Sequence, residues 1–340
     1  MIDLFFYGRN LKPLMNRSLS RSLQSILAAC LMATCLTNNV VAQEFPNRPI
    51  RIFVPAPPGG GSDTNARMVA SHMAKTLGQS VIVENRPGAS GIIADMAVVQ
   101  AKPDGYTVLY EIFSFAVNPS MRAMPFDAAK DLQPVSQVLN MTNILVVPSA
   151  APYQTLQEFL AYARAHPGEL TYASYGNGGT AHLAGEMLAR DAEIKWLHVP
   201  YKGGAPAVAD LLAGQVSAYF ANPISGLPHI QSGRLRALAI TSQKRIDALP
   251  NVPTFIESGL RDFEVLEWNG MFVPAQTPAA IVNKLNQAIV QALASPEIRG
   301  KMTSVGIEPV GNTPNEFGAF VNAELMRWAQ LVKTNNIKPD

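Results

Sequence analysis

Cysteine is almost absent from this chain of 340 residues, which has only Cys30 and Cys35, both near its start. Beyond residue 42 there is none, so that part needs no disulfide and has no thiol for nucleophilic chemistry. A polybasic stretch is also missing. Residues 1–42 hold four of the 27 Lys and Arg and one of the 25 Asp and Glu, which leaves 23 against 24. This balance argues against nucleic acid or an acidic membrane surface as a partner.

Motifs that mark common catalytic and metal sites are missing as well. The five histidines show no metal-ligand spacing, and neither GxSxG nor HExxH occurs. There is no GxxxxGK[ST], which excludes a phosphate-binding loop of the P-loop type. Catalysis therefore has weak support from the sequence, and we expect no metal ion and no cofactor.

Long apolar runs are limited to residues 23–36, which are too few for a stable membrane anchor. This run follows a basic stretch and precedes small residues at 40–42, the arrangement of a secretory signal. We expect residues 1–42 to be removed and the remainder to be exported to the periplasm. Residues 27–30 also resemble a lipoprotein box. Because apolar sequence continues beyond Cys30, we favour soluble export over a lipid anchor.

Residues 50–77 contain a strand, a glycine-rich loop and a helix in that order. Ile50, Ile52, Phe53 and Val54 form an apolar run long enough for a buried strand, and the loop Pro55–Gly61 ends in three glycines. The spacing of the apolar residues that follow predicts a helix capped by Ser62 or Asp63. Such a unit leaves free N–H groups at the helix start, beyond the carboxyl edge of the sheet, where an anion can bind.

This first loop has other interpretations. Gly59, Gly61 and Glu84 resemble part of a dinucleotide fingerprint, but Thr64 occupies the third glycine position, which weakens the close helix–strand packing of that motif. The glycines of one loop could also serve a tight turn alone. A second strand–glycine loop–helix unit at residues 170–189 favours an anion site shared by the two loops.

We expect these two loops to face each other across a cleft and to hold one anionic solute. Each helix start contributes roughly 0.3–2 kcal/mol to a bound anion, and each charge-assisted N–H bond contributes about 1.5–3 kcal/mol. Micromolar binding requires about 8 kcal/mol. Two loops could supply this without any Arg or Lys in the pocket.

The remaining pattern predicts two α/β lobes, each with an open, mostly parallel sheet. The first lobe comprises residues 43–145 and 268–340, and the second comprises residues 146–267. The chain crosses between them at residues 143–147 and again at 263–273, which predicts a hinge for closure around a ligand. Residues 111–120 are expected to form a loop beside the first glycine loop, and Thr313–Glu316 is a capping box that begins the last helix.

Several longer motifs carry a family resemblance, and together they cover the chain beyond residue 42 in order. They are VPAPPGGGSDTNAR, VIVENRPGASG, KPDGYTVL, YGNGGTAHLAGE, HVPYKGGAPAVADLLAGQV, LRALAITSQKR and EPVGNTPNEF. These motifs resemble the Bug family of periplasmic solute receptors of tripartite tricarboxylate transporters. The resemblance implies a type II periplasmic binding-protein fold, no enzymatic activity, and delivery of a small carboxylate to integral-membrane permease subunits. We expect the protein to act as a monomer.

In that family two loops hold the ligand carboxylate, and they match residues 57–63 and 175–180 of this sequence. Side chains next to these loops are further candidates; His182 could instead cap the helix, and Asn222 could instead serve packing. The candidate ligand-binding residues are Pro57, Pro58, Gly59, Gly60, Gly61, Ser62, Asp63, Phe113, Ser114, Tyr175, Gly176, Asn177, Gly178, Thr180, His182 and Asn222.

Departures from the family pattern suggest the kind of ligand. Family members commonly have Asp at the position of Ala221, and its absence removes a partner for a ligand ammonium. Phe113 and Tyr175 add aromatic surface near the cleft. We therefore expect an amine-free carboxylate, with aromatic acids such as terephthalate or a benzoate-like acid as candidates. Glu111 would repel a dianion if its carboxylate pointed into the cleft.

Two other functions fit the same architecture. One is a receptor that passes its ligand to a sensor or regulator instead of a permease. The other is a transferase-type enzyme, which the lack of cysteine, of a nucleophile–base pair and of a cofactor motif disfavours.

Overall fold

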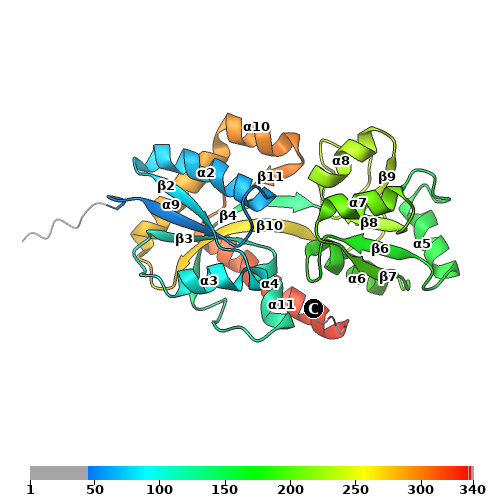
Figure 1. Ribbon diagram of the computed structural model, residues 1–340, viewed down its shortest axis with the longest axis horizontal. Coiled ribbons are helices and arrows are strands. Elements are labelled where there is room, and N and C mark those ends of the chain that lie inside the picture. The colour runs from blue at the N-terminus through cyan, green and yellow to red at the C-terminus, as the bar shows by residue number, and fades with distance from the viewer. Residues whose placement is uncertain (1–44, 336, 338–340) are drawn as a thin grey trace, which may run out of the picture. The chain divides into compact units, whose positions relative to one another are not determined.

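The strands predicted near the start of the chain form half of a six-stranded sheet. The computed structural model describes residues 45–335 and 337. β1 (Ile50–Val54) pairs in parallel with β2 (Val81–Asn85) and β3 (Thr107–Ile112). β10 (Leu266–Pro274) pairs antiparallel with both β3 and β4 (Leu132–Thr142), and β11 (Ile307–Pro309) pairs antiparallel with β4. The order is β11-β4-β10-β3-β1-β2, so this sheet is mixed and not mostly parallel as predicted (Figure 1).

The helices of this first lobe come from both ends of the described chain, as the crossing pattern predicts. Early helices pack against late ones: α2 lies against α9, and α4 lies against α11. Their bounds are α2 (Gly61–Leu77), the short 3₁₀ turn η1 (Ala89–Gly91), α3 (Ile92–Val99), α4 (Ser114–Met121), α9 (Ala279–Ala294), α10 (Pro296–Ser304) and α11 (Pro314–Thr334).

A second, five-stranded sheet has the order β7-β6-β8-β5-β9. β6 (Thr171–Ser174) pairs in parallel with β7 (Leu197–Pro200) and β8 (Ala218–Ala221). β5 (Ile144–Pro148) is antiparallel to β8 and to β9 (Leu235–Ile240), so this sheet is mixed too. The helices of this second lobe are α5 (Leu156–Ala165), α6 (Thr180–Asp191), α7 (Gly204–Leu212) and α8 (Pro223–Gln231). Two α/β lobes with mixed sheets are therefore the architecture of the chain.

The two segments that pass between the sheets are hydrogen-bonded to each other. β4 leads into β5 through Asn143, and the return passes from Thr241 toward β10. The Thr241 hydroxyl accepts from the Asn143 N–H (2.8 Å) and donates to the Val265 carbonyl (2.6 Å). The N–H of Thr241 donates to the Asn143 carbonyl at 2.9 Å. Because both threonine and asparagine are buried, these bonds fix the two crossing segments side by side.

Three local predictions can be compared with the structure. The last helix begins as predicted, with Thr313 and Glu316 capping each other's backbone N–H. The loop predicted at residues 111–120 is wrong, because β3 extends to Ile112 and α4 occupies most of the remainder despite Pro119. The predicted cap of α2 is also wrong. Its N-cap is Gly60, which has no side chain, and Ser62 and Asp63 lie inside the first turn.

Among the described residues, no helix is both long and apolar enough to cross a bilayer. The predicted secretory signal at residues 1–42 lies outside the described part of the chain. The described residues from Arg48 onward form one compact unit. Its core includes the large side chains of Trp268, Trp328 and Phe317, which are fully buried.

Candidate functional site

The first glycine loop is ordered by Asp63 from within helix α2. Its carboxylate accepts hydrogen bonds from the Gly59 N–H (2.8 Å), from Asn85 (2.9 Å) and from Arg67 (3.0 Å). Burial alone would raise the pKa of Asp63, but these hydrogen bonds and the Arg67 charge hold it below its ordinary value. Gly59 has φ +81°, which favours glycine over other residues. Asp63 is therefore a structural anion that shapes the loop.

Histidine and serine side chains hold the second glycine loop in place. The Gly178 N–H lies 3.0 Å from His182 Nδ1, and the His182 ring stacks on that of His198 at 3.9 Å. The Ser174 hydroxyl lies 2.7 Å from His198 Nε2 and donates to the Gly176 carbonyl at 3.1 Å. His182 lines neither of the two cavities described below. Its contacts support the structural alternative, in which it holds the loop at the start of α6.

Tyr175 connects this loop to both crossing segments. Its hydroxyl is within hydrogen-bond distance of Asn143 Oδ1 (3.2 Å), of Glu267 Oε2 (3.1 Å) and of the Thr180 hydroxyl. Asn143 lies on the first crossing segment, and Glu267 lies near the start of β10, on the second. Burial, with a smaller contribution from the Glu267 charge, raises the pKa of Tyr175 well above its ordinary value. Tyr175 therefore remains a neutral donor at physiological pH.

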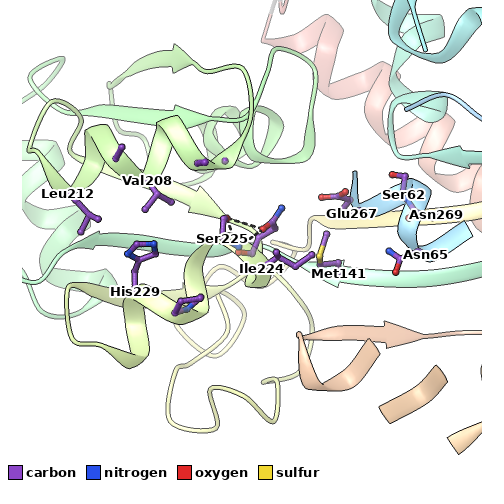
Figure 2. A pocket seen from close by; sticks show the side chains of 16 residues that line it. Ser62, Asn65, Met141, Val208, Leu212, Ile224, Ser225, His229, Glu267 and Asn269 are labelled. Atoms are coloured by element: carbon purple, nitrogen blue, oxygen red, sulfur yellow. Dashed lines mark hydrogen bonds between the residues drawn. The ribbon is translucent and has the colours of Figure 1, made fainter. Parts of the chain in front are cut away.

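Two cavities lie beside Glu267, which lines both of them. The larger, which we call the Ser62 cavity, has a volume of about 630 Å³. Figure 2 shows Ser62, Asn65 and Glu267 from the first lobe on one side of it and Val208, Ser225 and His229 from the second lobe on the other. Asn222, a predicted ligand contact, also lines it, but its side-chain oxygen accepts from the Ser225 N–H and so caps α8.

The smaller cavity, which we call the Arg122 cavity, has a volume of about 270 Å³. Seven predicted ligand-binding residues line it. They are Phe113, Ser114, Tyr175, Gly176, Asn177, Gly178 and Thr180. Phe113 is 3% exposed and its ring packs edge-on against Trp328 at 5.0 Å, so it presents a rigid aromatic wall.

Some of the remaining predicted residues line the Ser62 cavity, and the others line neither cavity. Gly61 and Ser62 line the Ser62 cavity, whereas the other predicted residues of the first loop line neither; these are Pro57, Pro58, Gly59, Gly60 and Asp63. The two glycine loops thus line separate cavities that share Glu267. Trp268 is fully buried against Phe317 and Phe320, which is a packing role.

Several helix starts at these cavities have no side-chain cap. They are those of α2 and α7 at the Ser62 cavity and those of α3, α4 and α6 at the Arg122 cavity. An uncapped helix start presents backbone N–H groups and a partial positive charge, which favour an anionic group. Both cavities therefore have the electrostatics for an anion.

Two charged residues at the Arg122 cavity were not predicted. Arg122, directly after α4, lines it together with Glu267. The expectation that the pocket needs no Arg or Lys therefore overlooks a guanidinium at its wall. Burial raises the pKa of the Glu267 carboxyl, and the hydrogen bond from Tyr175 partly offsets this. No local sequence signal identifies either residue, because their positions at the cavity depend on how the α4 segment and β10 pack in the folded chain.

Glu111 does not line either cavity. It is fully buried beside Asp95 of α3, and none of their four carboxyl oxygens has a hydrogen-bond partner among the described residues. Burial raises the pKa of Asp95 to about 7. Burial, and then the Asp95 charge, raise the pKa of Glu111 well above its ordinary value. Within the described part of the chain, no cluster of three or more His, Cys, Asp and Glu could hold a metal ion.

Comparison with known proteins identifies the family. Residues 65–337 match the model of the tripartite tricarboxylate transporter family receptor. The chain belongs to this family. BugT of Bordetella pertussis is 38% identical over 302 residues, which cover 88% of this chain and 93% of BugT.

Two solved structures show how similar the backbone is to that of relatives with ligands. The R. palustris protein Rpa4515 with adipate has a TM-score of 0.76 and 33% identity, covering 87% of this chain and all of that one. MatC from Rhodopseudomonas palustris with bound malate has a TM-score of 0.72 and 33% identity, covering 85% of this chain and all of MatC. The fold is therefore the two-lobed fold of periplasmic binding proteins, and the members of this family are receptors and not enzymes.

Proposed function

We propose that this receptor captures a small amine-free carboxylate, with an aromatic acid as the first candidate, in the Arg122 cavity. The observation that carries the proposal is the uncapped start of α6, which with the glycine loop before it forms one wall of a cavity of about 270 Å³. The relatives Rpa4515 and MatC, solved with adipate and malate, support a carboxylate as the ligand class.

The side chains around the cavity support an aromatic or otherwise apolar body on the ligand. Phe113, Ile112 and Met121 supply apolar surface, and the Tyr175 ring comes from the opposite lobe. Ala221, fully buried, offers no carboxylate for an ammonium. A ligand that binds both lobes favours the closed arrangement by its differential affinity, with the crossing segments near Asn143 and Thr241 as the hinge.

The family implies membrane components, and we propose that the receptor is exported to the periplasm, acts as a monomer and delivers its ligand to integral-membrane permease subunits. No described feature suggests nucleic acid as a partner.

A thermal-shift screen tests the ligand class. Benzoate, terephthalate, adipate and malate are compared with aspartate, glutamate and citrate at equal concentrations. A ligand present at 100 times its Kd adds about 2.7 kcal/mol to the free energy of unfolding. We expect benzoate-like or other amine-free acids to raise the Tm. A response only to aspartate, glutamate or citrate would reject the proposal.

A further inference from the structure

Two side chains of opposite charge, Arg122 and Glu267, line the Arg122 cavity, and no other Lys, Arg, Asp or Glu does. Within residues 45–335 and 337, neither forms an ion pair within 4.0 Å; the recorded pairs lie elsewhere. Structural ion pairs usually neutralise such groups when they are partly buried. Because neither side chain has an oppositely charged partner among these residues, both remain available to a ligand.

Arg122 lines this cavity and has an unmet hydrogen-bond donor. Its Nε atom is buried and has no acceptor among the described residues. A buried N–H without an acceptor is unfavourable, and a guanidinium matches a carboxylate with parallel N–H···O bonds. A ligand carboxylate is the chemical group that matches the charge of the guanidinium lining this cavity.

Glu267, from β10, has an unmet acceptor. Its Oε2 accepts the Tyr175 hydroxyl at 3.1 Å, and no donor to its Oε1 exists among the described residues. The side chain is only partly buried, and Figure 2 shows its carboxylate at the edge of the Ser62 cavity as well. A carboxylate with one oxygen unsatisfied attracts a hydrogen-bond donor and repels a second anion.

We propose that the ligand carries one carboxylate, which pairs with Arg122, and elsewhere a group that donates a hydrogen bond to Glu267. This inference rests on the proposed function and narrows the class of carboxylate that the receptor binds. Tyr175 is then a positioning residue, because its hydroxyl occupies one oxygen of Glu267 and leaves the other for the ligand. A hydroxyl on an amine-free acid supplies this donor, whereas a second carboxylate opposes Glu267. Among aromatic acids, a hydroxybenzoate is therefore preferred over terephthalate.

Two ligand series with matched size test the inference by titration calorimetry. The first is benzoate, 4-hydroxybenzoate, 4-(aminomethyl)benzoate and terephthalate. The second is hexanoate, 6-hydroxyhexanoate, 6-aminohexanoate and adipate, which gives the same comparison if the cavity rejects a ring. We expect the hydroxyl member to bind wild type about ten- to a hundredfold more tightly than the parent acid, the effect of one charge-assisted hydrogen bond. An ammonium member that binds more tightly than the hydroxyl member would contradict the amine-free ligand of the proposed function.

Two variants separate the contributions of the charges. Glu267→Gln keeps the size and an acceptor for Tyr175, and should lower the preference for the donor-bearing acid about tenfold while improving binding of the dicarboxylate. Arg122→Met should weaken every acid by tenfold or more without changing their order. Glu169→Gln and Arg299→Met, at exposed positions that line neither cavity, are the matched controls and should leave binding unchanged. Circular dichroism melts confirm that each variant is folded.

The outcomes distinguish this inference from the proposed function. If the acids bind but Glu267→Gln keeps the wild-type ranking, or Arg122→Met binds as well as the Arg299→Met control, the inference is wrong and the proposed function stands. If wild type binds neither series nor any other carboxylate, both are wrong. A dicarboxylate that binds wild type more tightly than the hydroxyl member also overturns the inference.

Discussion

The buried pair of Asp95 and Glu111 makes the stability of the receptor depend strongly on pH. Below about pH 4, Asp95 is protonated in both the folded and the unfolded chain. Between pH 4 and pH 7 the unfolded chain ionises while the folded chain keeps its proton, because burial raises the pKa of Asp95 from an ordinary 3.8 to about 7. The folded state then binds more protons, so the free energy of unfolding falls as the pH rises.

The size of the loss in stability follows from this shift in the pKa of Asp95. At about 1.4 kcal/mol per pH unit, the full loss above pH 7 is about 4 kcal/mol, of which about 3 kcal/mol falls between pH 5 and pH 8. Asp95→Asn keeps the shape of the side chain and removes the titration. We expect the free energy of unfolding of the variant, taken relative to wild type, to be about 3 kcal/mol higher at pH 8 than at pH 5. In wild type, Glu111 contributes in the same direction as Asp95.

Urea denaturation at pH 5 and pH 8 measures this directly, with Asp247→Asn at an exposed position as the control. The control should follow wild type at both pH values. If Asp95→Asn and wild type differ by the same free energy at pH 5 and pH 8, the carboxyl is not held protonated by burial and the reasoning is refuted.

Three further substitutions test the packing and the loop. Thr313→Ala removes the reciprocal cap of α11 and should lower the free energy of unfolding by about 1 kcal/mol in urea melts; no change would mean that the cap is dispensable. Gly270→Ala places a Cβ 2.1 Å from the buried Phe317 ring and should destabilise by at least about 2 kcal/mol, whereas Gly300→Ala on α10, with open space around it, should not. Equal melting temperatures for these two variants would contradict the packing. Gly178→Ala forces alanine to φ +71° near Met121 and should weaken binding of the tightest acid about tenfold with a smaller effect on the Tm; unchanged affinity would argue against a role of this loop in binding.

The sequence predicts the units whose signals are local. The apolar runs and glycines around residues 50–61 and 171–179 predict both strand–loop–helix units, and Thr313 with Glu316 predicts the start of α11. α4 was missed because Pro119 lies inside it. β4 was missed because it contains Pro134 and several polar residues, which its pairing with the distant β10 makes tolerable.

The candidate site was predicted only where its residues give a local signal in the sequence. The residues of the second glycine loop follow one another in sequence, so one motif identifies them together. Arg122 and Glu267 lie 145 positions apart and line the same cavity only because the chain returns to the first sheet through β10. The positions of single charged side chains in a folded site depend on such long-range contacts, which a single sequence does not reveal.

Calorimetric titration of one acid and of its uncharged primary amide tests the central claim most directly, because the two differ only in the charge that the start of α6 and Arg122 would bind. We predict that the carboxylate binds at least about a hundredfold more tightly than the amide. Equal affinity for the two would contradict capture through a carboxylate.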